Sequence, residues 1–267
     1  MNSYKISVIM PALNEENNVA KAVEDAVDSF VRTEVSGEIV IINDGSTDRT
    51  KDVAERLIKR HPFIRLINHS QPKGIGASFW EGVKESRGEV VTMLPGDGEN
   101  DAYEILRYLP VMEHVDIVIP FVYNNYVRSL KRRIISKFYK AIINISFGML
   151  LNYMNGTVMY RKCILDGIDL KANGFFYQTE LLIKCLKNRY IYAEVPYGLK
   201  KRDGGKSKAL TLKSLLEVMK GYLSVMAAIY LSNKDERHIA FDSVTAARKR
   251  QMDDHEEGFP TVLSKQA

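Results

Sequence analysis

Short apolar runs alternate with segments of helical periodicity through the first half of the chain. Runs such as Ile6–Met10, Glu38–Ile42 and Val90–Leu94 are typical of strands that are buried on both faces of a parallel sheet. Between the runs, apolar residues recur at three- and four-residue spacing, which predicts helices, and Asn14 and Asp48 are suited to cap the first two. Strands and helices that alternate with short connections predict an α/β fold, with a mostly parallel sheet flanked by helices.

The same pattern predicts where each element lies. Strands are expected at residues 6–10, 38–42, 63–67, 90–94, 115–119, 157–160 and 190–197. Helices are expected after Asn14, after Asp48, from Gly74 to Gly88, and at residues 103–112, 128–151, 176–188 and 210–231. The second half therefore contains two long amphipathic helices.

The domain organisation follows from these elements. We predict one α/β domain at residues 1–210, which includes the amphipathic helix 128–151, then a C-terminal amphipathic helix at 211–232 and a polar, mobile tail at 233–267. A chain of 267 residues that is 45% hydrophobic is long enough to bury one substantial core. No apolar stretch reaches the roughly 20 residues of a membrane span, so no transmembrane helix is expected.

Composition and charge exclude several classes of function. The net charge of +5 is modest, and the basic residues lack the interleaved aromatic residues of a nucleic-acid surface, so no nucleic-acid partner is expected. Cys163 and Cys185 form no CxxC motif, which argues against a zinc site or a disulfide framework. The five histidines are dispersed, and no catalytic role is expected for them. Met1–Lys5 does not begin a secretory signal, so a cytoplasmic location is expected.

Four polar motifs lie at the ends of the apolar runs. They are Pro11–Glu16, Asn43–Asp48, Lys73–Gly76 and Gly96–Asp101. Ligands of parallel α/β sheets bind in the crevice beyond the carboxyl ends of the strands. The four motifs should therefore converge on one pocket.

Three acidic residues in these motifs suggest specific chemistry. Asp97 and Glu99 alternate on a glycine-flanked loop, so both carboxylates can serve as ligands for Mg²⁺ or Mn²⁺ beside a diphosphate. Asp44 ends a buried strand and can accept hydrogen bonds from a ribose or a base. Taken alone, each motif is equally consistent with a turn that carries solvated acids. Their occurrence together and in this order favours the binding site.

The ordered segments Ser7–Glu16, Ile41–Asp48 and Lys73–Ala77 resemble the nucleotide-sugar-binding half of family 2 glycosyltransferases. The resemblance covers about residues 4 to 210 and implies the GT-A fold, a Mg²⁺ or Mn²⁺ cofactor, and Asp97 at the second aspartate of the metal motif, with Glu99 as a further ligand. Pro95 stands where that motif has its first aspartate. The donor-binding residues implied by the resemblance are Pro11, Leu13, Glu15, Ile42, Asp44, Lys73, Gly96 and Lys208.

A closer resemblance is to polyprenyl-phosphate glycosyltransferases of the dolichyl-phosphate mannose synthase type. Leu130–Ser136 resembles the basic segment that opens their interfacial helix, and Glu194–Pro196, followed by Arg202 and Lys208, resembles their phosphate-binding loop. The residues that this resemblance assigns to the acceptor phosphate are Arg128, Lys131, Arg132, Arg133 and Ser136. The alternative for these basic residues is a solvated helix face or a contact with an anionic membrane.

The resemblance implies an inverting transfer from a UDP- or GDP-linked sugar to a polyprenyl phosphate, with Asp97 and Arg202 in catalytic roles. A second reading is transfer to a saccharide or glycolipid hydroxyl, for which Glu180 is the candidate general base. A third reading, prompted by Pro95, is a non-catalytic nucleotide-sugar-binding protein. The two amphipathic helices suggest peripheral attachment to a membrane, and packing on the sheet or a homodimer contact is the alternative.

Overall fold

Seven strands form one sheet in the order β3-β2-β1-β4-β6-β5-β7 in the computed structural model, which describes residues 4–124, 126, 129–198, 212–231 and 239–257. Strand β6 is antiparallel to both of its neighbours, β4 and β5, and the other pairs are parallel. The strands are β1 Ile6–Ala12, β2 Gly37–Asn43, β3 Ile64–Asn68, β4 Val90–Met93, β5 Ile117–Val122, β6 Met159–Arg161 and β7 Tyr192–Tyr197. The predicted mostly parallel α/β sheet is confirmed.

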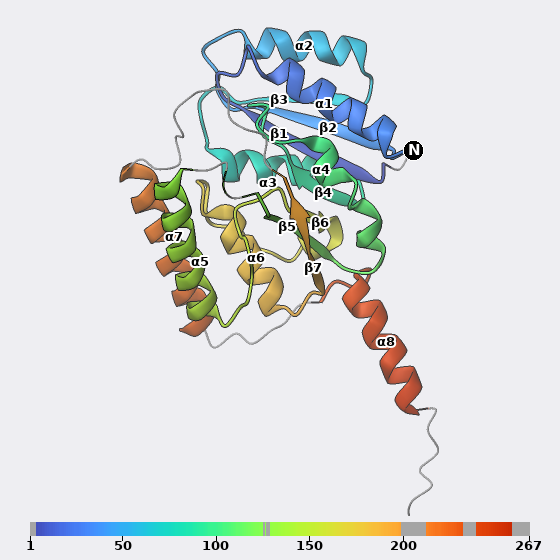
Figure 1. The fold of residues 1–267 in the computed structure, drawn as a ribbon. Helices are drawn as coiled ribbons and strands as arrows, with labels where there is room; N and C mark the ends of the chain where they lie inside the picture. The colour runs from blue at the N-terminus through green and yellow to red at the C-terminus, as the bar shows by residue number, and fades with distance from the viewer. Residues whose placement is uncertain (1–3, 125, 127–128, 199–211, 232–238, 258–267) are drawn as a thin grey trace, which may run out of the picture.

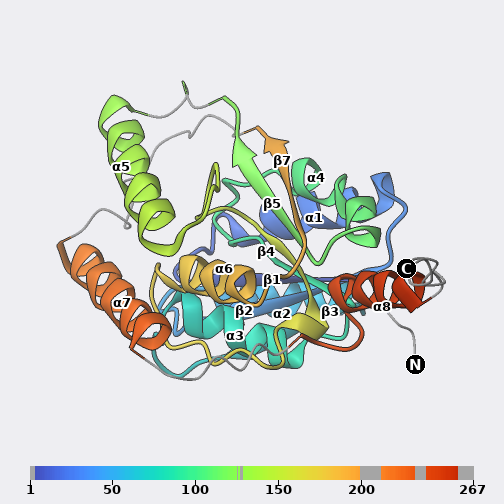
Figure 2. The same cartoon turned by 90° about the horizontal axis from the view of Figure 1, so that it is seen from below.

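Helices cover both faces of this sheet (Figures 1 and 2). Helices α1, α2 and α4 lie on one face, while α3 and α6 lie on the other, with α5 and α7 beside them. The α-helices are α1 Val19–Arg32, α2 Thr50–Arg60, α3 Ile75–Glu85, α4 Ala102–Leu106, α5 Leu130–Phe147, α6 Tyr177–Lys187, α7 Leu212–Tyr230 and α8 Val244–Glu257. Short 3₁₀ turns occur at Leu109–Glu113 and Lys162–Ile164.

The apolar runs form strands because both of their faces are covered. All seven residues of β1 are buried; Val8 packs into the core shared with α1 and α2, and its neighbour Ile9 packs into the core shared with α3 and α6. Successive side chains of a strand point to opposite faces, so a strand between two helical layers must be apolar throughout. This explains the lack of alternation in the sequence.

The sheet brings the four polar motifs to one edge. Because β6 is antiparallel to both β4 and β5, strands β5 and β7 run in the same direction as β1, β2, β3 and β4. The segments that follow β1, β2, β3, β4, β5 and β7 therefore all begin at the same edge, called the donor edge below. Asp116, which precedes β5, lies at the opposite edge.

Two stretches of the chain differ from the elements that the sequence predicts. The single helix expected at residues 103–112 is split into α4 and a 3₁₀ turn, because Pro110 lacks an N–H and clashes with the preceding turn. The polar tail expected at 233–267 contains α8, a helix that the sequence did not predict, while residues 233–238 and 258–267 lie outside the described residues. The N–H groups of Val244 and Thr245 donate to the buried carboxylate of Asp116, at 2.7 and 3.0 Å. A cap 128 positions away in sequence therefore starts α8.

Helices α5 and α7 contact each other through aromatic residues. The Ser146 hydroxyl lies 2.8 Å from the hydroxyl of Tyr222, and Phe147 stacks on Tyr230 with 6.3 Å between ring centroids. Both helices match the amphipathic segments that the sequence predicts. Among the described residues, no helix is both long and apolar enough to span a bilayer.

Candidate functional site

The loops that follow β1 and β2 are tied together by side-chain to backbone hydrogen bonds. Asn14 donates its N–H to Ser46 Oγ at 3.0 Å and accepts the N–H of Thr47 at 2.9 Å. Asp48 accepts the N–H of Glu16 at 3.1 Å and that of Thr50 at 2.9 Å. Asn14 has a φ of 58° and lies before α1, so its predicted capping role is wrong, whereas Asp48 does bind the first turn of α2. These hydrogen bonds join the two loops into one unit.

The loop that carries the candidate metal ligands joins this unit. Gly96 donates its N–H to the carbonyl of Pro11 at 2.9 Å, and a Cβ at position 96 would lie 3.2 Å from the Cβ of Ala12. Glu15 is partly buried and donates its N–H to Thr50 Oγ1 at 2.8 Å. The structure thus brings Pro11, Glu15 and Gly96 together at the donor edge, as the sequence predicts.

Asp44 organises the glycine-rich loop, which comprises residues 73–76. Its carboxylate is almost fully buried and accepts the N–H of Lys73 at 2.8 Å and the N–H of Gly74 at 2.9 Å. Gly74 has a φ of 100°, a conformation that favours glycine. Asp44 therefore holds the backbone of this loop, in addition to any contact with a nucleoside.

His69 completes this arrangement, a role that the sequence did not predict. Its buried ring places Nδ1 2.7 Å from Asp44 Oδ1 and Nε2 2.8 Å from Glu81 Oε2. Lys73 Nζ lies 3.0 Å from the same Glu81 oxygen. When the imidazole carries both protons, it donates to both carboxylates.

The position of His69 shortly after an apolar run indicates that it lies at the same edge of the sheet as Asp44. Asp44 is the first residue after β2 and His69 the first after β3, and the last residues of these strands, Asn43 and Asn68, pair in register. The amide of Asn43 also donates to Asn68 Oδ1 at 3.1 Å. The two strands therefore deliver Asp44 and His69 to adjacent positions.

The surroundings lower the pKa of two carboxyl groups in this network. Burial alone would raise the pKa of Asp44, but the N–H groups of Lys73 and Gly74 and the ring of His69 stabilise its carboxylate and bring the pKa below the ordinary value. Burial would likewise raise the pKa of Glu81, but Lys73 and His69 lower it. Both groups are therefore carboxylates at neutral pH.

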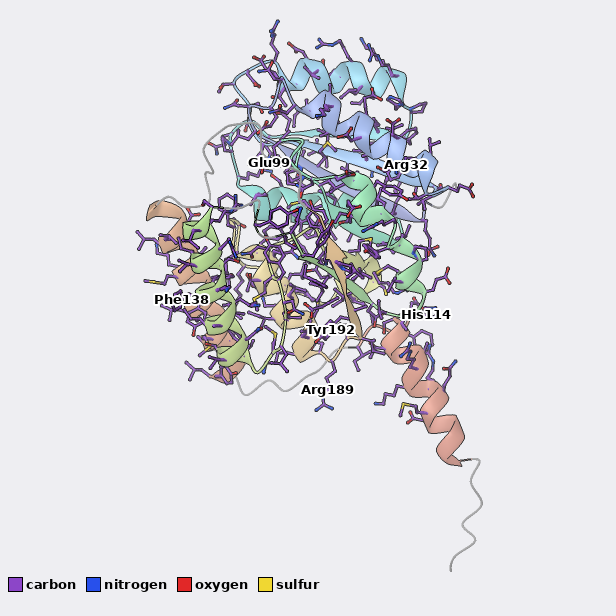
Figure 3. All side chains as sticks on the ribbon, viewed as in Figure 1. Arg32, Glu99, His114, Phe138, Arg189 and Tyr192 are labelled. Atoms are coloured by element: carbon purple, nitrogen blue, oxygen red, sulfur yellow. The ribbon has the colours of Figure 1, made fainter. Side chains whose placement is uncertain are left out.

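Asp97 and Glu99 lie partly buried on the loop after β4. The N–H of Glu99 donates to Asp97 Oδ1 at 3.1 Å, which curves the loop around Gly98. A Cβ at Gly98 would meet no atom of other residues within 4 Å, so the space beside Gly98 itself is open. Figure 3 places Glu99 among the loops at the donor edge. Among the described residues, no three His, Cys, Asp or Glu side chains group to hold a metal, so Asp97 and Glu99 would supply only part of a coordination shell. Their carboxylate oxygens are nevertheless the ligand type that a hard divalent cation takes, with the remaining positions left to a diphosphate or water.

The end of β7 is tied to this loop. The Tyr197 hydroxyl donates to Asn100 Oδ1 at 2.9 Å, and the N–H of Gly198 donates to Glu104 Oε2 at 3.3 Å. Tyr197 therefore lies beside the loop that carries Asp97 and Glu99. Arg202 and Lys208, predicted to bind phosphate, lie outside the described residues.

The start of α5 carries the residues predicted for the acceptor. Ser129 caps the helix by accepting the N–H of Arg132 at 3.4 Å. Arg132, Arg133 and Ser136 are partly buried. Arg128, and the side chain of Lys131, lie outside the described part of the chain.

The other residues predicted for the site differ in how deeply they are buried. Leu13 is partly buried at the donor edge, and Lys73 is exposed there with its ammonium on Glu81. Ile42 is fully buried within β2, so its side chain belongs to the core. Glu180 is also buried, and its carboxylate accepts the N–H groups of Lys171 and Ala172. These contacts do not favour the general-base role suggested for Glu180.

Comparison with known proteins places this geometry in a family. The model of glycosyl transferase family 2 matches residues 7–168. The dolichol-phosphate mannosyltransferase of Pyrococcus furiosus is 26% identical over 219 residues, which are 78% of this chain and 60% of that protein. A dolichyl-phosphate beta-glucosyltransferase of Trichomonas vaginalis is 37% identical over 112 residues, 39% of this chain and 35% of that protein. The chain thus spans less than two thirds of the length of these relatives.

Solved structures share the fold. A crystal structure of glucosyl-3-phosphoglycerate synthase from Mycobacterium tuberculosis, in complex with Mg²⁺ and UDP, matches with a TM-score of 0.63 at 20% identity, over 84% of this chain and 80% of that one. Another, with Mn²⁺, UDP-glucose and phosphoglyceric acid, matches with a TM-score of 0.60 at 20% identity, over 84% and 79% of the two chains. The fold agrees with the family model, which matches more than half of the chain, and the protein therefore belongs to glycosyl transferase family 2.

Proposed function

We propose that this protein is an inverting glycosyltransferase that moves a sugar from a UDP- or GDP-linked donor to a polyprenyl phosphate at the cytoplasmic surface of a membrane. Membership of glycosyl transferase family 2 supports the transfer of a sugar. The curated relatives, which are named for transfer to dolichyl phosphate, support the lipid-phosphate acceptor. The donor and acceptor sides of the site each add physical support.

On the donor side, hydrogen bonds within the protein hold the loops in place. Asn14, Asp44 and Asp48 hold the backbone of three loops by accepting N–H groups at the donor edge. A site that is already ordered loses little conformational entropy when a nucleotide binds. Leu13, Glu15 and Asp44 are our proposed contacts to the nucleoside.

On the metal side, Asp97 and Glu99 would hold Mg²⁺ or Mn²⁺. Bound there, such a cation supplies positive charge that stabilises a departing nucleoside diphosphate. Arg202 and Lys208 are proposed to add charge to the same diphosphate, because they follow β7 in the sequence and Tyr197, at the end of β7, donates to Asn100 on the loop that carries Asp97 and Glu99.

On the acceptor side, α5 combines charge with an exposed apolar face, and this observation carries the proposal. Arg132 and Arg133 stand in the first turn, which follows the carboxyl end of β5 at the donor edge. The apolar face continues along α5 and α7 through exposed Leu130, Ile134, Phe138, Ile142, Ile145, Leu215, Leu216, Met219 and Leu223. Figure 3 places Phe138 on the outer side of α5. A basic, apolar helix pair suits a surface of anionic lipid.

The proposed chemistry needs no general base. A lipid phosphate is anionic near neutral pH, so its oxygen can attack the anomeric carbon directly while the bond to the nucleoside diphosphate breaks on the opposite face. Arg132 and Arg133 would hold the phosphate by charge-assisted hydrogen bonds. A hydroxyl acceptor would need a carboxylate to take its proton, and Glu180, the candidate for that role, is engaged by Lys171 and Ala172.

The test is transfer of label from UDP- and GDP-sugars into an organic-extractable polyprenyl phosphate, with Mg²⁺ or Mn²⁺ and with EDTA. We expect label in the lipid phase that EDTA abolishes. Donor hydrolysis without lipid product would instead favour a hydroxyl acceptor. Nucleotide binding without any turnover would identify a non-catalytic binding protein.

A further inference from the structure

Glu180 is a buried acid whose contacts the proposed chemistry does not use. It lies in the first turn of α6 with 1% of its surface exposed. Its two oxygens accept the N–H of Lys171 at 3.1 Å and the N–H of Ala172 at 2.8 Å, and Lys184 Nζ lies 2.5 Å from Oε1. A buried carboxylate that accepts backbone N–H groups fixes the segment to which they belong. Glu180 thus fixes residues 171–172.

The fixed segment supports the glycine-rich loop. The carbonyl of Asn173 accepts the N–H of Gly76 at 2.8 Å. A Cβ at Gly74 would lie 2.6 Å from the Asn173 oxygen, and a Cβ at Gly76 would lie 2.5 Å from the oxygen of Ala172. The two backbones therefore touch directly, and any displacement of residues 171–173 reaches the loop.

The glycine-rich loop is thus held from two sides. Asp44 accepts the N–H groups of Lys73 and Gly74 on one side, and Asn173 accepts the N–H of Gly76 on the other. Asp44 is positioned in turn by His69, whereas Asn173 is adjacent to the segment held by Glu180. The conformation of residues 73–76 depends on both carboxylates.

We infer that Glu180 is a positioning residue for donor binding, which acts through residues 171–173 on the glycine-rich loop. The inference rests on the proposed function, because it takes the nucleotide donor to bind at the donor edge. A positioning role and a general-base role differ in their consequences. A positioning residue changes donor binding in the absence of any acceptor, whereas a general base acts only on the acceptor during transfer.

The test compares Glu180→Gln with Asp116→Asn. Asp116 is a matched control because it is also buried and also accepts two backbone N–H groups, but at the opposite edge of the sheet. The dissociation constants of UDP and GDP with Mg²⁺ are measured by calorimetry without acceptor, and transfer kinetics are measured with it. We expect Glu180→Gln to raise the nucleotide dissociation constant and the donor KM about tenfold, with kcat changed by less than about threefold, and Asp116→Asn to leave all three unchanged.

Amide hydrogen exchange gives a readout that needs no ligand. In Glu180→Gln we expect faster exchange both in residues 171–176 and in residues 73–79, because the two segments are coupled.

If Glu180→Gln does not fold, Lys184→Met keeps both N–H acceptors and removes the cation that orients the carboxylate. It should then shift the same quantities about two- to fivefold.

The outcomes separate the two proposals. An unchanged nucleotide dissociation constant with a collapsed kcat would overturn the positioning role and establish a general base. Equal losses of donor affinity in Glu180→Gln and Asp116→Asn would also overturn it, because the effect would then be general destabilisation. If the wild type binds neither nucleotide, both the proposed function and the inference fail. This holds even if amide hydrogen exchange shows that residues 171–176 and 73–79 are coupled.

Discussion

Several polar side chains at the donor edge accept hydrogen bonds from the backbone of neighbouring loops. Asn14 accepts the N–H of Thr47, and Asp48 accepts the N–H of Glu16. Asp44 accepts the N–H groups of Lys73 and Gly74. These hydrogen bonds connect the loops of the site to one another. At this scale, the sequence indicates which polar residues matter, and the structure adds that several of them hold loops.

A first prediction concerns the acid sensitivity of Asp44. Its pKa is lowered on folding, so its carboxylate contributes stability above its ordinary pKa of about 3.9, and that contribution is lost as pH falls through the lower folded value. Urea unfolding of the wild type should therefore show stability that falls steeply below about pH 4. Asp44→Asn should be less stable at pH 7 and have a flatter profile. A variant with the wild-type slope would contradict this account.

A second prediction concerns the metal. Asp97→Asn removes one of two proposed ligand carboxylates, so transfer should fall at least about 100-fold. Asp101→Asn is the matched control on the same loop, because Asp101 accepts the N–H of Tyr103 as a helix cap and asparagine caps equally well. It should keep transfer within about threefold of wild type. Retention of activity by Asp97→Asn would exclude Asp97 as a ligand.

At the scale of elements, α5 has two different faces. Ile143 and Phe147 are buried against the body of the protein, while Phe138 and Ile145 are 67% and 83% exposed. The amphipathic period is visible in the sequence, but it does not reveal which apolar residues would remain uncovered. The structure leaves an apolar stripe along this helix and continues it on α7.

A third prediction tests what covers that stripe. Phe138→Ser combined with Ile142→Ser should lower binding to vesicles of anionic lipid by at least about tenfold, because each side chain contributes roughly 1.5–3 kcal/mol when buried. Phe241→Ser is the matched control, since Phe241 is 73% exposed and lies outside α5 and α7. Sedimentation of the full chain with vesicles measures the difference. Unchanged vesicle binding together with a halved mass in solution would identify a homodimer contact instead.

At the scale of the whole molecule, the donor edge and the attachment of α8 lie at opposite ends of the strands. Helix α8 projects away from the body in Figure 1, and its first turn is held by Asp116, before β5. Thr245 adds a further link, because its hydroxyl donates to Asp116 and accepts the N–H of Ile191 at 2.9 Å. The C-terminal segment therefore stabilises the sheet at a distance from the site.

A fourth prediction follows from this separation. Thr245→Val keeps the shape of the side chain and removes both hydroxyl contacts, so it should lower the free energy of unfolding by about 1–3 kcal/mol. Nucleotide affinity should not change. Thr33→Val, which removes a single local hydrogen bond to the carbonyl of Ser29, should cost less. A loss of nucleotide affinity in Thr245→Val would show that the two edges are coupled.

Sequence patterns predicted most of the fold because the burial of a strand or helix is visible in its own residues. Val8 and Ile9 must both be apolar because β1 is covered on both faces, so the strand is recognisable without a partner. The break at Pro110 was also readable in principle, because proline cannot continue a helix. The contacts of His69 and Glu180 were not predicted, because their partners are distant in the sequence. His69 contacts Asp44, 25 positions away, and Glu180 accepts N–H groups from residues 8 and 9 positions away.

Local sequence patterns were enough to predict the α/β class, the order of most elements up to α7 and the loops at the donor edge, and to reveal the resemblance to a glycosyltransferase family. Strand burial, helical period and local motifs are properties of contiguous residues. Tertiary structure was needed to show that Asp116 caps α8, that His69 lies between two carboxylates and that Glu180 accepts backbone N–H groups. Each of these depends on a contact between segments that the sheet brings together, and no local pattern encodes such a contact.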